Sequence, residues 1–126
     1  MFQIKSDSKG SYFYRKLKPE ISFSDMLDTL NYFKDCSNLP SNLRILEDSR
    51  DVKVAFSIKE IPDIMKDAIE IMKSYDLVKH AIVYNSALYT AYGLLAEKFV
   101  SNERYFLKVF SSMEAAKDWL EIDDSL

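Results

Sequence analysis

The sequence predicts an α/β fold with a mixed, mostly parallel five-stranded sheet. Short apolar segments alternate with amphipathic helical segments, the first two apolar segments form a hairpin, and one later segment is apolar in both alternating sets. Strands separated by helices of ten to fifteen residues are joined by right-handed crossovers and lie parallel. With 126 residues the chain is long enough for one core, so we expect a single domain over 1–126.

The N-terminal elements follow from turn and cap residues. Residues 2–5 and 12–18 are predicted to pair as a hairpin around the turn 6–10, in which Gly10 supplies any positive φ that the turn needs. A capping-box pattern begins at Ser22, and apolar residues then recur at helical spacing as far as about residue 35. The first helix is therefore predicted over about 22–35.

The rest of the chain repeats the alternation of strand and helix. The predicted segments are strand 43–48, helix 62–74, strand 78–85, helix 88–99, strand 105–110 and helix 112–120. The order is β-β-α-β-α-β-α-β-α. Strand 78–85 is apolar in both alternating sets, which indicates burial on both faces and a central position. Trp119 is expected to be mostly buried against the sheet.

Composition excludes several functional classes. A net charge of −3 gives no electrostatic footprint for nucleic acid or anionic lipid, and no run of eighteen apolar residues predicts membrane insertion. The N-terminus has no signal-peptide pattern, and Cys36 is the sole cysteine, interpreted as a helix-end residue. We therefore expect a cytoplasmic protein.

Catalytic and metal patterns are also lacking. His80 is the sole histidine and lies inside a strand that is expected to be buried, with no second histidine or cysteine to share a metal. We find no strained nucleophile turn for a Ser-His-Asp triad. The expectation is a histidine of the core, no enzyme activity, no metal and no cofactor.

Three segments resemble the STAS or SpoIIAA-like superfamily, whose best-known members are bacterial anti-sigma-factor antagonists. The segments are HAIVYNSALYTAYGLLAEKF (80–99), LKVFSSMEAAKDWL (107–120) and LEDSRDVKVAFSIKEI (46–61). The element order matches over nearly the whole chain. The resemblance implies a SpoIIAA-like fold and, since its motifs are packing motifs, leaves function open.

Ser57 is the residue that the resemblance singles out. Phosphorylatable antagonists of the family begin this helix with Asp-Ser-Ser-Gly, whereas this chain has Phe56, Ser57, Ile58 and Lys59, so only the acceptor serine is kept. Ser57 also begins a capping box with Glu60. Because Pro62 lacks an N–H, we expect one tight turn after Ser57 and a regular helix from Pro62. A structural cap is the preferred interpretation, and a phosphorylation switch is the alternative.

Ligand crevices in open α/β sheets lie beyond the carboxyl ends of parallel strands. Here that edge carries Asp48, Arg50, Asn85 and Ser86, with Ser57 nearby, and these are the candidate ligand or regulatory residues. Each also fits a simple cap or surface pair. The sequence favours a non-enzymatic protein-interaction module with an unknown protein partner, and its eight Tyr and eight Phe suit a homodimer interface. The alternative is a domain that binds a small apolar or anionic ligand.

Overall fold

The computed structural model describes residues 2–35, 39–100 and 104–123. Within these, the elements are β1 (Gln3–Asp7), β2 (Gly10–Lys16), β3 (Glu20–Ile21), α1 (Phe23–Asp35), β4 (Asn42–Asp48), β5 (Lys53–Val54), a 3₁₀ turn (Ile58–Glu60), α2 (Ile61–Met72), β6 (Leu77–Val83), α3 (Ala87–Glu97), β7 (Tyr105–Phe110) and α4 (Met113–Leu120). Cys36 lies outside the described residues.

The main sheet has the strand order β1-β2-β4-β6-β7. β1 is antiparallel to β2, and the other neighbours are parallel, as the sequence predicts. The hairpin turn is tighter than expected, because β1 runs on to Asp7 and β2 begins at Gly10, whose φ is +119°. A second, two-stranded parallel sheet joins β3 to β5 and was not predicted.

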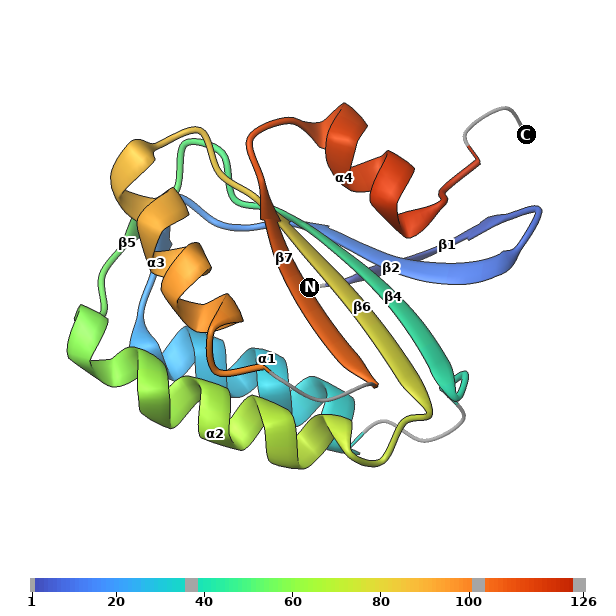
Figure 1. Ribbon diagram of the computed structural model, residues 1–126, viewed down its shortest axis with the longest axis horizontal. Helices are drawn as coiled ribbons and strands as arrows, with labels where there is room; N and C mark the ends of the chain where they lie inside the picture. Colours follow the sequence, from blue (N-terminus) through green and yellow to red (C-terminus); the bar gives the residue numbers. More distant parts are fainter. Residues whose placement is uncertain (1, 36–38, 101–103, 124–126) are drawn as a thin grey trace.

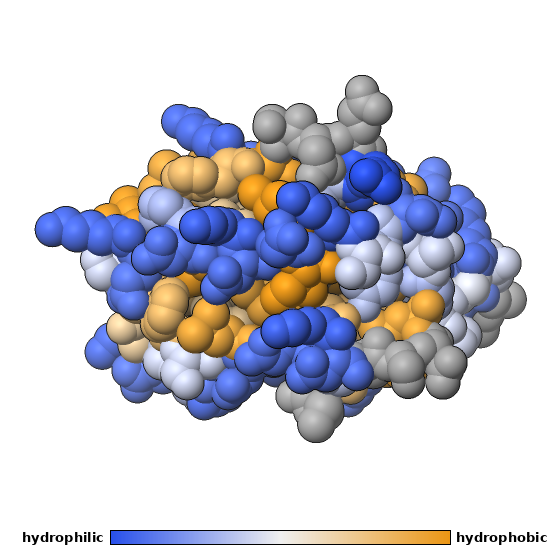
Figure 2. All heavy atoms as spheres, turned by 90° about the horizontal axis from the view of Figure 1, so that it is seen from below, coloured by the Kyte–Doolittle hydropathy of each residue, from blue (hydrophilic) through white to orange (hydrophobic). Residues whose placement is uncertain are grey.

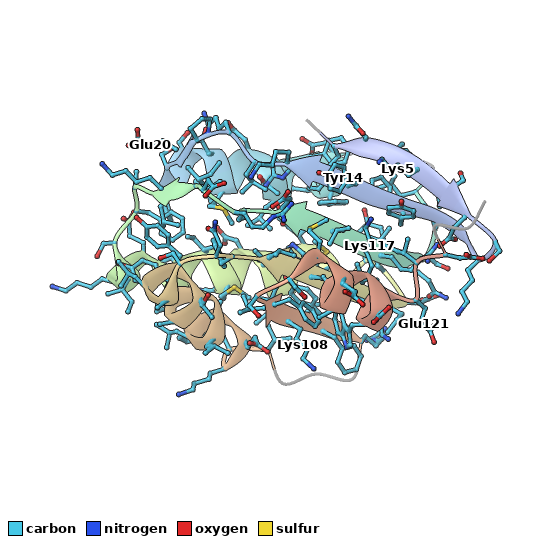
Figure 3. The ribbon with its side chains drawn as sticks, turned by 90° about the horizontal axis from the view of Figure 1, so that it is seen from above. Lys5, Tyr14, Glu20, Lys108, Lys117 and Glu121 are labelled. Carbon is cyan, nitrogen blue, oxygen red and sulfur yellow. The ribbon has the colours of Figure 1, made fainter. Side chains whose placement is uncertain are left out.

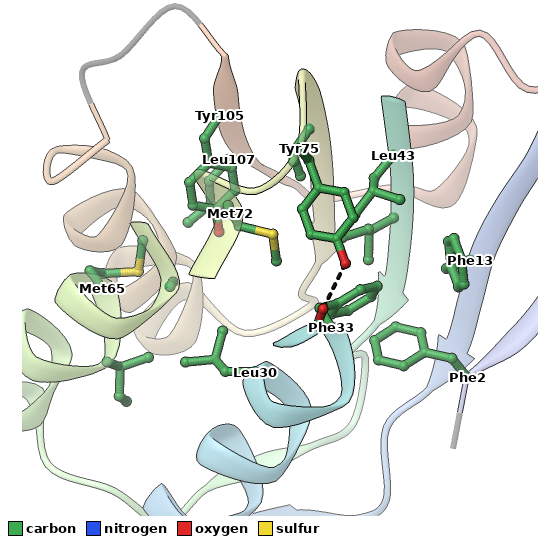
Figure 4. Close-up of a cluster of buried hydrophobic side chains, with 14 of the residues drawn as sticks. Phe2, Phe13, Leu30, Phe33, Leu43, Met65, Met72, Tyr75, Tyr105 and Leu107 are labelled. Atoms are coloured by element: carbon green, nitrogen blue, oxygen red, sulfur yellow. Dashed lines mark hydrogen bonds between the residues drawn. The ribbon is translucent and has the colours of Figure 1, made fainter. Parts of the chain in front are cut away.

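Helices cover both faces of the main sheet. Figure 1 shows α1, α2 and α3 on one face and α4 on the other. The larger core lies under the first three helices, where rings from the N-terminal strands meet side chains of α1 and α2. Tyr75 closes one end of this core by donating its hydroxyl to the carbonyl of Phe33 at 2.6 Å (Figure 4).

The first helix begins as its cap residues predict. The Asp25 N–H donates to Ser22 Oγ at 3.1 Å, and the Ser22 N–H donates to Asp25 Oδ2 at 2.8 Å. Leu30 and Phe33 are buried one turn apart against the sheet. Between the outer faces of α1 and α2 lies a groove of about 270 Å³, and the view from below shows apolar atoms between hydrophilic ones on this side (Figure 2).

The opposite face carries a smaller core beneath α4. Leu46, Ala81 and Val83 meet Ala116 and Leu120 there. β1 and β2 extend beyond α4, and Lys5 lies 4.8 Å from the centre of the Tyr14 ring (Figure 3).

Trp119 packs against the smaller core, as expected, and is mostly but not fully buried. Its ring packs on Phe110, with ring centres 5.6 Å apart, and lies under the ammonium of Lys79, and part of the side chain stays exposed. The reason is that α4 has only eight residues and turns Ala116 and Leu120 toward the sheet, which leaves Trp119 on the rim of the small core.

Candidate functional site

A row of four polar side chains crosses the helix-facing side of the main sheet. Arg15 comes from β2, Glu47 from β4, His80 from β6 and Tyr105 from β7. Alternate residues of a strand share a face, so each of these lies on the same side as the apolar core residues of its strand. The parallel register places Arg15 directly beside Glu47. We call Arg15, Glu47, His80 and Tyr105 the polar row.

Glu47 is the centre of the polar row. Its side chain is almost fully buried, with 1% of the residue exposed. Oε2 accepts from Arg15 Nε at 2.7 Å and lies 2.5 Å from Arg15 Nη2, while Oε1 is in close contact with His80 Nε2. Burial alone would raise the pKa of Glu47, but the charges and hydrogen bonds of Arg15 and His80 outweigh it and lower the pKa to about 2. Glu47 is therefore a buried carboxylate at neutral pH.

At the far end of the polar row, beyond His80, the polar groups are neutral hydroxyls. The Tyr105 hydroxyl lies 3.4 Å from His80 Nδ1. Burial, and then the charge of Glu47, raises the pKa of Tyr105, and the same two causes come first in raising the pKa of Tyr84. Both phenols keep their protons at physiological pH. The Ser49 hydroxyl is buried near Tyr84 but makes no hydrogen bond of normal geometry.

The near end of the polar row reaches the surface. Arg15 Nη2 donates to Thr29 Oγ1 at 2.7 Å, and Thr29 donates to the Asp25 carbonyl at 3.0 Å. The guanidinium carbon stands 4.5 Å from the centre of the Phe2 ring. Arg15 lines an open groove of about 410 Å³ beside α1, so one side chain joins this groove to the buried carboxylate.

A cavity of about 70 Å³ lies between the sheet and the three helices on this face. Its polar wall is formed by Glu47, His80, Tyr105, Tyr84 and Thr29. The other lining residues are apolar or aromatic and come mainly from α1, α2, α3, β6 and β7: Met26, Leu30, Phe56, Ile61, Ile64, Met65, Ala68, Ile82, Tyr92, Gly93, Ala96 and Leu107. The cavity is thus apolar with hydrogen-bonding groups at one side.

The five candidate residues from the sequence take up other places. Asp48 binds Arg50 through two hydrogen bonds of 2.9 Å, and the Arg50 N–H donates to Asp48 Oδ1 at 3.1 Å. The pKa of Asp48 is lowered, first by the Arg50 hydrogen bond. Asn85 exchanges two hydrogen bonds with Asp51, whose φ is +63°, and so joins the loops after β4 and β6.

Ser57 and Ser86 lie at helix starts. Ser86 Oγ accepts from the Tyr89 N–H at 3.4 Å as the N-cap of α3. Ser57 Oγ accepts from the Lys59 N–H at 3.2 Å, and the Ser57 N–H donates to Glu60 Oε1 at 2.9 Å. A 3₁₀ turn follows, and α2 begins at Ile61 with a proline in its first turn, as Pro62 predicts. The cavity is lined by other residues than these five.

The sequence did not single out Arg15, Glu47 or Tyr105. A signal was present, because Glu47 is in phase with the apolar residues Leu43 and Ile45 of the same strand. A charged residue in phase with two core positions indicates a buried charge that needs a partner. The identity of the partner depends on strand order, which a single sequence does not specify.

Two further properties concern ions and membranes. Within residues 2–35, 39–100 and 104–123, no group of three or more His, Cys, Asp or Glu side chains is placed to hold a metal ion. No helix in the same ranges has both the length and the apolar character to cross a bilayer.

Comparison with known proteins supports the fold. No family model matches the chain, and no curated protein does. A solved structure from Shewanella loihica PV-4, of an uncharacterised DUF3478-family protein with a SpoIIAA-like fold, superposes with a TM-score of 0.63 over 95% of this chain and 92% of that chain. The fold is SpoIIAA-like. The two sequences are 18% identical, so the likeness extends to the fold alone.

Proposed function

We propose that this SpoIIAA-like domain binds a small, mainly apolar molecule in the cavity under α1, α2 and α3. The observation behind the proposal is that the cavity has apolar walls and a polar side made of Thr29, Glu47, His80, Tyr84 and Tyr105. Binding pockets in general combine apolar walls with a few placed polar groups. A purely structural core has no need of a buried carboxylate, since ion pairs are costly to bury.

The size of the cavity limits the ligand. About 10–15 Å³ of such space holds one water molecule, so 70 Å³ corresponds to about five to seven non-hydrogen atoms. Larger ligands would have to move α3, which is held mainly by its contact with β7 and buries only Gly93 fully among its residues. Small molecules of about this size are therefore the proposed ligand class.

The proposed role is binding without catalysis. The two ring nitrogens of His80 contact Glu47 and Tyr105. An imidazole activates a nucleophile by removing a proton from a serine or cysteine, and neither Glu47 nor Tyr105 is such a residue. Glu47 is held as a carboxylate by Arg15, which makes it a poor proton acceptor. Both features support a binding site.

The test is a titration of the isotope-labelled protein with three probes of similar size: isobutyrate, isobutyramide and methylcyclopentane. At least one should shift the amide signals of residues around the cavity. Ala68→Leu fills the cavity from α2 and should abolish these shifts. If that variant is unstable, Ala96→Val, which fills the cavity from α3, should abolish them instead. Ala115→Leu on the exposed side of α4 is the control. Shifts with none of the probes, or shifts that survive both filled variants, would contradict the proposal.

A second candidate function, interaction with another protein, is favoured by the outer face of α3. The helix ALYTAYGLLAE has no charged residue before Glu97, and its solvent side presents Leu88 and Leu94, which are 58% and 50% exposed. Surface helices normally carry charged residues on that side. We propose a second copy of this chain as the partner, because an apolar helix face can pair with itself about a two-fold axis.

This association is tested by sedimentation at micromolar concentration. Wild type should sediment as a dimer, and the double variant Leu88→Glu, Leu94→Glu should sediment as a monomer. Ile4→Glu is the matched control, since Ile4 is 61% exposed on β1, at the edge of the sheet. A wild-type species of 14.7 kDa alone, or a dimer that the double variant leaves intact, would contradict the proposal.

A further inference from the structure

The open groove beside α1 has the size and the lining of a binding site. Its volume is about 410 Å³, and pockets that hold small molecules commonly measure about 300–1,000 Å³. Its apolar lining comes from Phe2 before β1, Leu17 after β2, Ile21 of β3 and Tyr32 of α1. The other lining residues carry a charge or a hydroxyl group. The groove therefore combines apolar walls with polar groups, as binding pockets do.

Arg15 is a fixed hydrogen-bond donor in the wall of this groove. Its Nε and Nη2 lie on Glu47 Oε2, Nη2 also donates to Thr29 Oγ1, and the guanidinium stands over the Phe2 ring. The donors on Nη1 make no hydrogen bond within the described residues, and 12% of the side chain is exposed. Because Glu47 already compensates the charge of Arg15 and would repel a second carboxylate, Nη1 suits a neutral acceptor such as a carbonyl oxygen.

The charges around the groove leave the carboxylate of Asp28 unmatched among the described residues. Lys18 Nζ lies 2.8 Å from Asp25 Oδ1, and Lys16 Nζ lies 3.6 Å from Asp48 Oδ1, so both ammonium groups have a carboxylate partner. Asp28 is exposed, lines the groove, and forms neither a hydrogen bond nor an ion pair with any residue that the structure describes. The groove therefore offers an anion to a cationic group of a ligand.

Asp28 and Arg15 are close to each other in the groove. Asp28 directly precedes Thr29 in α1, and Thr29 Oγ1 accepts from Arg15 at 2.7 Å. A ligand that fits both residues has a cation near a carbonyl oxygen and an apolar group beside them. The first residue of a peptide combines these three groups around one carbon atom: the α-ammonium, the first carbonyl and the first side chain.

We propose that the groove beside α1 binds the free amino-terminal residue of a peptide whose first side chain is apolar. The α-ammonium lies against the Asp28 carboxylate, and the first carbonyl oxygen accepts from Arg15 Nη1. The first side chain packs on the rings of Phe2 and Tyr32, whose centres are 5.3 Å apart. The following residues continue along the open groove. This site is separate from the internal cavity and does not depend on the ligand proposed there.

The test is a titration of the isotope-labelled protein with phenylalanyl-glycyl-glycinamide, a tripeptide with a free amino group and a neutral carboxyl end. It should shift the amide signals of residues 15–18 and 25–32 and the side-chain Nε signal of Arg15. The N-acetylated tripeptide should bind about fivefold more weakly, because it lacks the cation that pairs with exposed Asp28. Triglycinamide should also bind more weakly, because it buries no apolar side chain.

Asp28→Asn is the decisive variant. It removes the charge and breaks no contact within the described residues, so the protein should fold as wild type. It should bind the tripeptide about fivefold more weakly and the N-acetylated form as wild type does, since the acetylated peptide has no cation to lose. Asp67→Asn changes an exposed aspartate on the outer side of α2 and is the matched control, expected to bind both peptides as wild type.

Several outcomes would overturn the inference. Equal affinity for the free and the acetylated tripeptide, or unchanged affinity in Asp28→Asn, would show that no ammonium lies against Asp28. Shifts at residues away from the groove, or no shifts at millimolar tripeptide, would show that the groove does not bind it. Free phenylalanine bound as tightly as the tripeptide would mean a site for a zwitterion. The isobutyrate titration reports on the cavity alone, so either proposal can fail without the other.

Discussion

Arg15 places two nitrogens on a single oxygen of Glu47, at 2.7 Å from Nε and 2.5 Å from Nη2, and leaves the other oxygen to His80. This division makes Glu47 the link between the surface groove beside α1 and the internal cavity. It also means that the carboxylate has a partner on each oxygen, as a buried charge requires.

Removing one partner of this buried pair should destabilise the protein strongly. Arg15→Met leaves the Glu47 carboxylate with His80 alone and should lower the free energy of unfolding by about 3–5 kcal/mol. Lys73→Met is the matched control, because Lys73 forms an exposed ion pair with Glu70 at 2.9 Å, and such pairs contribute about 0–1 kcal/mol. Urea unfolding measures both. A loss for Arg15→Met no larger than that for Lys73→Met would show that the pair is not buried in solution.

Acid should weaken the fold through Glu47. Its folded pKa of about 2 lies below the ordinary value of 4.5, so its ionisation stabilises the protein fully above pH 4.5, and the contribution is lost as the pH falls toward 2. The loss amounts to about 3 kcal/mol. Asp7 and Asp48 also have lowered pKa values and act in the same direction. Glu47 therefore has to be isolated by a variant.

The measurement compares wild type with Glu47→Gln in urea at pH 6 and pH 3. Wild type should lose more stability between the two pH values than the variant, and the difference is the share of Glu47. If the variant does not fold, the carboxyl carbon signal of Glu47 in the wild-type protein reports the same titration. A Glu47 that titrates at its ordinary value would contradict the prediction.

The sequence anticipated the elements better than the contacts between them. Helix caps and apolar periodicity are local signals in the sequence. The bounds predicted from Ser22 for the start of α1, from Pro62 for the start of α2 and from the apolar pattern for β6 therefore agree with the structure to within about two residues. β3 and β5 were missed because two-residue strands contain no period. The polar row was missed for a different reason: Arg15 and Glu47 are 32 positions apart and meet only because β2 lies beside β4.

Gly93 should be intolerant of even one added carbon. A Cβ at this position would lie 2.2 Å from Val109 Cγ2 and 3.2 Å from Val109 Cβ, so α3 approaches β7 as closely as a bare backbone allows. Alanine gains about 1 kcal/mol of helix propensity over glycine, but overpacking costs about 1–3 kcal/mol, so Gly93→Ala should be net destabilising.

The compensating variant is Val109→Ala. Removing the Val109 methyl groups clears the nearest contact, so Gly93→Ala with Val109→Ala should be more stable than the sum of the two single changes predicts. Thermal unfolding of the four proteins measures this coupling. Strict additivity would mean that α3 is not held against Val109.

Ser57 has a structural role that can be separated from a regulatory one. Its side chain and the Glu60 carboxylate exchange hydrogen bonds with the backbone of the turn before α2. Ser57→Ala should cost about 1 kcal/mol, whereas Ser57→Asp should be accepted because aspartate caps as well as serine. Under the switch hypothesis, Ser57→Asp would keep its stability but lose a protein partner, as added negative charge does at a phosphorylation-controlled surface. Pull-downs with wild-type and Ser57→Asp bait, identified by mass spectrometry, separate the two. We expect identical partner lists, and phosphate on Ser57 in the native protein would overturn that expectation.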